Sequence, residues 1–163
     1  MRRLPFLVLL VGSIAVPGYA QAQRPPQAET ETRASHPPGP VLCDRGAIRD
    51  ADVAAILGAP IARHSGNPND CRFVTAAGAS LTVSWHPGRG NLAMAQWSKP
   101  TPDYGAVPVP GLGDRALWLA KLRGLHATKN DVLCDVFSDA AKGTDADLER
   151  KYGALCVKLW TLK

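Results

Sequence analysis

The sequence predicts an α+β fold: a single antiparallel sheet of about five to six strands, with helices packed on one face and two disulfides. Three observations lead to this prediction. Runs that alternate apolar and polar residues follow one another with only short turns between them, which favours antiparallel pairing over a doubly wound parallel sheet. Amphipathic helical segments stand before and after these runs, and the chain has four cysteines, an even number.

The first 22 residues are typical of a secretory signal peptide. Two arginines precede an apolar stretch over 4–16, and Ala20-Gln21-Ala22 forms a small-x-small cleavage signal. A membrane span needs about 20 apolar residues, more than this stretch has. Cys43 follows Leu42 and a polar segment, so we expect no lipid anchor. The mature protein is expected to be soluble, without a membrane span, and periplasmic or secreted.

Residues 23–41 are predicted to be a disordered proline-rich linker, because they offer little apolar surface to offset the entropy of ordering. The remainder, 42–163, has the size of a single α+β domain. The net charge of the chain is +5, and Arg2 and Arg3 of the predicted signal peptide contribute to it. The other basic residues are scattered, so nucleic-acid binding is not expected.

The first half of the domain predicts a helix over 50–58, followed by strands. Asp50 is expected to cap the helix, Gly58 to end it in the left-handed conformation, and Pro60 to block its continuation. Residues 64–69 are predicted to be a turn, because glycine, asparagine and proline cluster there. Strands are predicted over 71–74 and 79–85, the second with its leucine, valine and tryptophan on one face.

The second half predicts more strands and a long final helix. A short helix is expected over 91–97 and a proline-rich connector over 100–110. Thr144, with Asp147 three residues later, resembles a capping box for the final helix. Cys156 lies at the edge of the apolar face of that helix. The predicted strands cover 115–121, 124–128 and 132–137.

The four cysteines allow three disulfide pairings, and the sequence alone does not choose among them. We favour Cys43–Cys71 and Cys134–Cys156, because each bond then stays within one half of the chain. An exported chain with an even cysteine count usually forms disulfides. The chain has no C-x-x-C motif and no clustered histidines, so neither a redox centre nor a metal site is predicted.

The segment VPGLGD contains two glycines but lacks the third glycine and the following helix of a dinucleotide fingerprint. We therefore interpret it as a turn in which Gly111 or Gly113 has a positive φ. Together with "ADVAAILG", "GASLTVSW", "ALW" and "KNDVLCDV", the segment resembles a motif of small exported bacterial proteins and lipoproteins of unknown function. The resemblance spans Cys43 to the end of the chain, but this chain lacks a lipobox. It implies the fold and no catalytic residue.

The sequence predicts no catalytic residue, cofactor or metal ligand. Ser84 and His86 share a strand face, but no G-x-S-x-G motif occurs, and the acids lie at turns and caps. Trp160 lies outside the apolar arc of the final helix and is the candidate for an exposed interaction residue.

These observations predict a non-catalytic periplasmic or secreted binding module of unknown ligand, whose partner is a protein or a cell-envelope component. The alternative is a carrier of small apolar ligands, or a weak enzyme, with a pocket between sheet and helices. An exposed aromatic patch would favour the first, and a closed pocket with convergent polar groups the second.

Overall fold

The computed structural model describes residues 40–97 and 104–163. The predicted signal peptide, and all but the last two residues of the predicted linker, lie outside these ranges. The elements in chain order are η1 (Leu42–Arg45), α1 (Asp50–Leu57), β1 (Ile61–Gly66), β2 (Asp70–Thr75), β3 (Ser80–Pro87), α2 (Gly90–Trp97), β4 (Ala106–Pro108), β5 (Arg115–Leu119), β6 (Gly124–Lys129), β7 (Val132–Ser138) and α3 (Asp145–Leu159).

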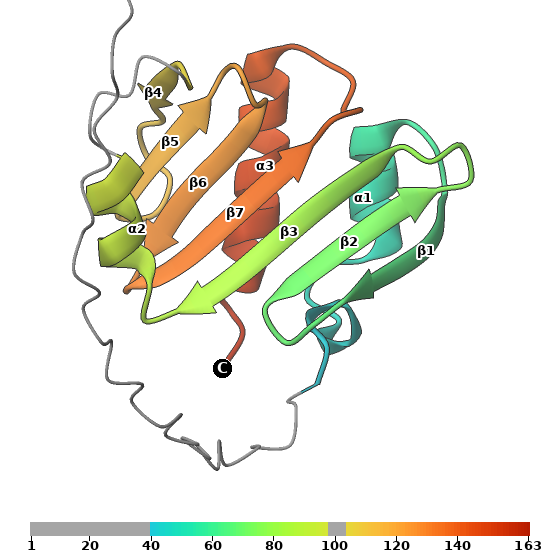
Figure 1. The fold of residues 1–163 in the computed structure, drawn as a ribbon, viewed down its shortest axis with the longest axis horizontal. Coiled ribbons are helices and arrows are strands. Elements are labelled where there is room, and N and C mark those ends of the chain that lie inside the picture. The colour runs from blue at the N-terminus through green and yellow to red at the C-terminus, as the bar shows by residue number, and fades with distance from the viewer. Residues whose placement is uncertain (1–39, 98–103) are drawn as a thin grey trace, which may run out of the picture. The chain divides into compact units, whose positions relative to one another are not determined.

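The strands of the described ranges form one antiparallel sheet of seven strands, in the order β1-β2-β3-β7-β6-β5-β4 (Figure 1). This order consists of two meanders, β1 to β3 and β4 to β7, whose last strands pair with each other in the middle of the sheet. The predicted α+β class with one antiparallel sheet is confirmed, and the number of strands is slightly higher than predicted.

The two strands that the prediction missed are the two edges of the sheet. β1 occupies part of the predicted turn over 64–69, and β4 lies within the predicted connector over 100–110. Five of the six residues of β1 are exposed, so the strand has no alternation of apolar and polar residues to reveal it. β4 has only three residues. At both edges, pairing with the neighbouring strand overrides a weak local pattern.

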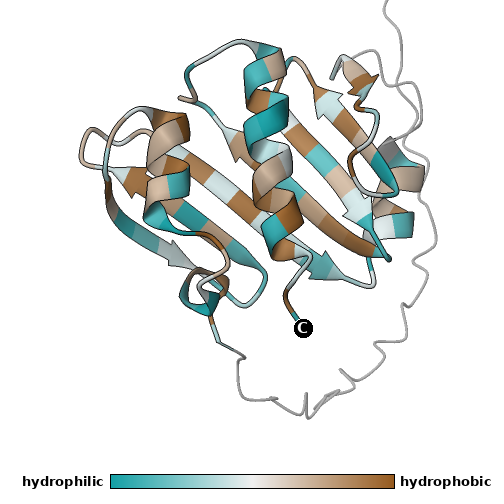
Figure 2. Cartoon of the chain, turned by 180° about the vertical axis from the view of Figure 1, so that it is seen from behind, coloured by the Kyte–Doolittle hydropathy of each residue, from teal (hydrophilic) through white to brown (hydrophobic). Residues whose placement is uncertain are grey.

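Helices α1 and α3 lie side by side on one face of the sheet and enclose the main core (Figures 1 and 2). Phe73 and Trp118 point toward them from the sheet, and Tyr152 packs against Trp118 with ring centroids 5.9 Å apart. The indole Nε1 of Trp118 donates to Asp145 Oδ2 at 3.1 Å, at the start of α3. Burial raises the pKa of Tyr152 to about 12, so this phenol stays neutral within the core.

The predicted helix over 91–97 is confirmed as α2, which does not join the other two helices. It packs against β6 and β7, and its Met94 is 1 % exposed without belonging to the core between the sheet and α1 and α3. Leu119 and Leu133 are also buried outside that core. α2 therefore covers part of the opposite face, and the predicted placement of helices on one face holds for α1 and α3.

The caps of the two core helices follow the sequence only in part. Thr144 caps α3, since its Oγ1 accepts a hydrogen bond from the Asp147 N–H at 3.3 Å, as predicted. In α1 the predicted cap, Asp50, is already the first helical residue. Arg49 is the N-cap instead, and the Asp52 carboxylate accepts from the Arg49 N–H at 3.1 Å. The N3 side chain of a capping box, Asp52, thus bonds to the N-cap backbone, but the N-cap is one residue earlier than the sequence predicted.

Asp52 also joins the two core helices to each other. Its Oδ2 lies 2.6 Å from the Nζ of Lys158 on α3. Burial raises the pKa of this carboxyl, but the hydrogen bonds from Lys158 and Arg49 outweigh that effect and lower the pKa to about 2. The carboxylate is therefore charged over the whole neutral and mildly acidic range.

Both disulfides lie where helical segments meet the sheet. Cys43 of η1 is bonded to Cys71 of β2, and Cys134 of β7 is bonded to Cys156 of α3. This is the pairing that keeps each bond within one half of the chain. The second bond crosslinks the terminal helix to the middle of the sheet, since β7 pairs with β3 and with β6.

Candidate binding face

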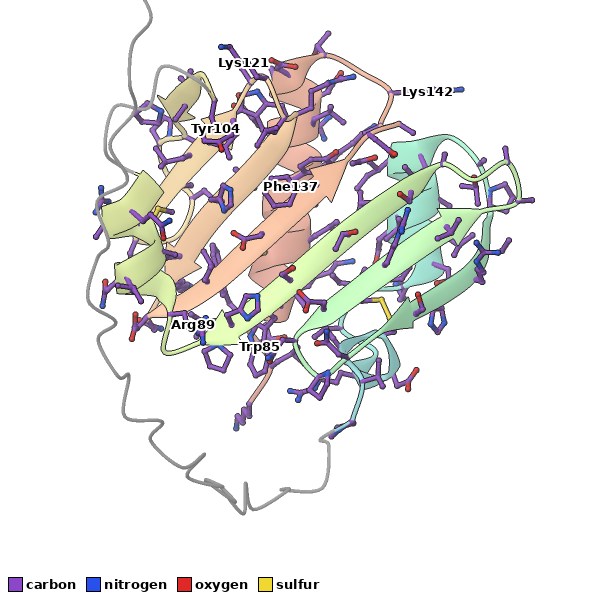
Figure 3. The ribbon with its side chains drawn as sticks, viewed as in Figure 1. Trp85, Arg89, Tyr104, Lys121, Phe137 and Lys142 are labelled. Carbon is purple, nitrogen blue, oxygen red and sulfur yellow. A yellow bond between two sulfur atoms is a disulfide. The ribbon has the colours of Figure 1, made fainter. Side chains whose placement is uncertain are left out.

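The face of the sheet opposite α1 and α3 is the candidate site, and we call it the open face. In β3 and β7 the side chains of Val83, Trp85 and Val136 belong to the main core, so the alternating residues between them point to the other side. Within the described ranges no helix covers this side of β1, β2 and β3. Its side chains are those of Asp70, Arg72, Thr82, Ser84, His86, Asp135 and Phe137, and Figure 3 labels Phe137 among them.

The register of the sheet places a row of polar residues across the open face. Asp70 is opposite Ser84, and Ser84 is opposite Asp135. Asp135 is in turn opposite His126 on β6. The row therefore crosses four neighbouring strands and ends where α2 begins to cover the sheet.

His126 and Asp135 form the buried end of this row. His126 is 3 % exposed, and its Nδ1 is hydrogen-bonded to Oδ1 of Asp135. The Asp135 side chain is 14 % exposed. Phe137 packs edge-on against the imidazole, with ring centroids 5.0 Å apart. A buried polar side chain needs such a partner, because an unpaired one would cost about 1–3 kcal/mol.

The order of Ser84, Asp135 and His126 in the row differs from that of a Ser-His-Asp site. In a Ser-His-Asp arrangement, the histidine lies between the serine that it deprotonates and the carboxylate that orients it. Here Asp135 lies between Ser84 and His126. The other nearby histidine, His86, lies 3.8 Å from Asp70, with its Nε2 toward the Asp70 carboxylate. As predicted, Ser84 and His86 share the face opposite the core, and His86 faces the carboxylate of Asp70 on the neighbouring strand.

A shallow groove of about 330 Å³ lies on the open face, and we call it the Phe137 groove. It is lined by Arg72, Ser80, Thr82, Leu122, Phe137, Ser138 and Asp139. The hydroxyls of Ser80 and Ser138 serve the fold, since Arg72 donates to Ser80 Oγ at 3.1 Å and Ser138 Oγ donates to the Ser80 carbonyl at 2.7 Å. The polar groups left for a ligand are the remaining N–H groups of Arg72, the Thr82 hydroxyl and the Asp139 carboxylate.

Gly124 fixes the position of the Phe137 ring. The two residues are paired across β6 and β7, and a Cβ at position 124 would overlap the Phe137 ring. The ring thus lies over the glycine, toward β6. Figure 3 shows Phe137 on the viewer's side of the sheet. This placement keeps the ring away from Thr82 on β3, its partner on the other side, and leaves room for the groove.

The VPGLGD segment is a structural turn. Gly111 has φ 76° and Gly113 has φ 62°, which confirms the predicted positive φ. The Asp114 N–H donates to the Thr128 carbonyl at 2.7 Å, and its Oδ2 accepts from the Asn130 N–H at 2.7 Å. The turn therefore fastens the start of β5 to the hairpin between β6 and β7.

Trp160 packs beneath this turn. It is half-buried and follows the last residue of α3, and its ring lies against Gly113, where a Cβ would be 2.8 Å from Cη2. Lys129 covers the ring, with Nζ 6.0 Å from the centroid. The prediction that Trp160 is exposed is wrong, because the helix wheel accounts for the neighbours of α3 on the sheet and not for the turn above it.

Sequence reasoning missed His126 and Asp135, although a local signal pointed to them. The β6–β7 hairpin turns at Asn130 and Asp131, which have φ 52° and 60°. A two-residue turn with both central φ values positive fixes the register of a hairpin. That register places His126 opposite Asp135. The predicted strands over 124–128 and 132–137 leave a turn of three residues, 129–131, instead of two. An error of one residue in the register of a hairpin moves every side chain to the other face.

Comparison with known proteins finds no match, whether with family models, curated proteins or solved structures. Within residues 40–97 and 104–163, no group of three or more His, Cys, Asp and Glu side chains is placed to hold a metal ion. In the same ranges no helix is long and apolar enough to cross a membrane.

Proposed function

We propose that the protein is an exported, non-catalytic binding module that engages its ligand through the open face. The observation that supports this is the unequal covering of the sheet, since α1 and α3 fill one face while β1, β2 and β3 are free of described helices on the other. Antiparallel sheets can leave a polar face in water. Here, however, Phe137 and the 42 % exposed Leu122 adjoin a guanidinium, hydroxyls and a carboxylate, the mixture found in binding sites.

Export is part of the proposal. The N-terminal pattern of 1–22 and the two disulfides support it, because structural disulfides persist in oxidising compartments. The resemblance of the VPGLGD segment and the cysteine pattern to small exported bacterial proteins agrees with it. A periplasmic or secreted location then makes a protein or a component of the cell envelope the source of the ligand.

The alternative, a carrier or weak enzyme with a pocket between sheet and helices, is less well supported. Side chains that are nearly unexposed fill that space, including Val53, Leu81 and Leu148. Among the described residues, one groove lies beside α1, one between α1 and α3, one between α3 and the VPGLGD turn, and one on the open face. The order of Ser84, Asp135 and His126 does not match a nucleophile with its base.

The test is a ligand screen of the purified protein, followed by two-dimensional ¹H–¹⁵N NMR. Neutral sugars, free amino acids and fatty acids, the building blocks of proteins and of cell-envelope components, are added as separate classes. The proposal expects saturable shifts at amides of β2, β3 and β7, with those of α1 and α3 unmoved. Shifts confined to the grooves beside α1 and α3, or a fatty acid that moves core amides, would contradict it.

A further inference from the structure

We infer that the Phe137 groove binds a small zwitterion, namely a free α-amino acid with an apolar side chain. This inference rests on the proposed function and adds the chemistry of the ligand. It is drawn from two charged side chains of opposite sign, one apolar wall and the spacing of three strands.

The two charges are Arg72 and Asp139, and both line the groove. Both are exposed, and among the described residues neither forms an ion pair. They do not pair with each other either. The hydrogen bond from Arg72 Nη2 to Ser80 Oγ holds the guanidinium at one side of the groove. A guanidinium has five N–H donors, so several remain for a carboxylate.

The spacing of the charges suits a ligand whose own charges are close together. Arg72 is on β2 and Asp139 directly follows β7, with β3 between them. Adjacent strands are about 4.8 Å apart, and the Arg72 side chain already reaches across to Ser80 on β3. A gap of about one strand spacing then separates the two charged groups. An α-amino acid carries its carboxylate and its ammonium on one carbon, and can bridge such a gap with one charge toward each side chain.

The apolar wall accounts for the side chain of the ligand. Phe137 and Leu122 border the groove, and Leu122 is 42 % exposed. Since Gly124 holds the Phe137 ring over β6, the ring presents apolar surface next to the polar residues of β3. An aromatic side chain of a ligand can pack against this ring. The volume of about 330 Å³ lies at the small end of the range for ligand sites.

The pair of charges also excludes ligands with one charge only. An anion that binds Arg72 alone is repelled by Asp139, and a cation that binds Asp139 alone is repelled by Arg72. Selection by repulsion of this kind gives specificity beyond what attraction provides. A zwitterion satisfies both groups.

The experiment uses three probes that differ by one charge: L-phenylalanine, L-phenylalaninamide and N-acetyl-L-phenylalanine. Each is titrated into the purified protein and followed at the amides of Arg72, Thr82 and Phe137. An open groove and a ligand of this size give an expected Kd on the order of 1 mM for L-phenylalanine. The amide lacks the carboxylate and the acetylated form lacks the ammonium, so each should bind at least tenfold more weakly.

Variants assign each charge to its partner. In Arg72→Gln, the affinity for L-phenylalanine should fall about tenfold, while the affinity for the cationic amide should rise because Arg72 no longer repels it. In Asp139→Asn, the difference between L-phenylalanine and its acetylated form should disappear. Arg63→Gln is the matched control, since Arg63 is an exposed arginine on β1 that does not line the groove, and it should leave all three affinities unchanged.

Three results would overturn the inference. Equal binding of all three probes to the parent protein would show that neither Arg72 nor Asp139 interacts with the ligand's charges. An equal effect of Arg72→Gln and Arg63→Gln would show that the loss of affinity comes from the net charge of the protein and not from the groove. If neutral sugars shift the open face and amino acids do not, this inference fails while the proposed function stands. If no class shifts that face, the proposed function fails with it.

Discussion

Replacing Gly113 with alanine tests whether the VPGLGD segment is a structural turn. At φ 62° an alanine adopts the left-handed conformation, which costs about 1–2 kcal/mol, partly offset by about 0.4–1 kcal/mol from a stiffer unfolded chain. The new Cβ also overlaps the Thr128 carbonyl oxygen and lies 2.8 Å from the Trp160 ring. Relieving such a contact typically costs a further free energy of about 1–3 kcal/mol. These contributions add to an expected loss of unfolding free energy of about 1–4.5 kcal/mol, centred near 3 kcal/mol.

The matched control is Gly111→Ala, two residues earlier. Gly111 has φ 76°, but a Cβ there meets nothing within 4 Å, so only the backbone contribution remains and the loss should be about 1 kcal/mol or less. Urea denaturation followed by tryptophan fluorescence separates the two, because a loss of about 2 kcal/mol lowers the midpoint by roughly 1 M. Equal losses in the two variants would refute the argument from close contact. A parent-like Gly113→Ala protein with a lost ligand response would show that the turn is itself a binding site.

Three further changes test the fold. Replacing both Cys134 and Cys156 by alanine should lower the free energy of unfolding by about 3 kcal/mol, while the other disulfide still forms, as peptide mapping without reductant would show. Four free thiols in the parent protein would contradict this. Asp52→Asn should cost about 1–2 kcal/mol at pH 7, since Lys158 is partly exposed and water screens the pair. The folded-state pKa of Asp52 is lowered to about 2, so this contribution is present above pH about 4 and disappears as the pH falls toward 2; a gap between parent and variant that persists at pH 2 would exclude the pair as its source. Thr144→Ala should cost about 1 kcal/mol and Thr144→Ser very little, both measured by urea denaturation, and equal losses would argue against the cap.

The fold could be predicted where a segment carries its own pattern. The final helix has a capping threonine, an apolar stripe and Cys156 on the edge of that stripe, and the structure has all three. β3 alternates apolar and polar residues, and its position within the sheet does not change that pattern. β1 has no such pattern, and only its pairing with β2 makes it a strand. Local sequence therefore revealed the inner strands and missed the edges.

The candidate site required information that no single segment contains. His126 and Asp135 meet within one hairpin, so a correct turn assignment would have paired them. Arg72, Thr82 and Phe137 come from three strands that lie side by side only because β3 pairs with β7, across 50 or so residues of chain. That pairing joins two meanders end to end, and many registers between them would preserve the alternation of β3 and β7. In the observed register, Thr82 is opposite Phe137, which is itself opposite Gly124. A shift of two residues between β3 and β7 would keep the alternation and still move Thr82 away from Phe137, so the groove depends on a choice of register that the hydrophobic pattern does not make.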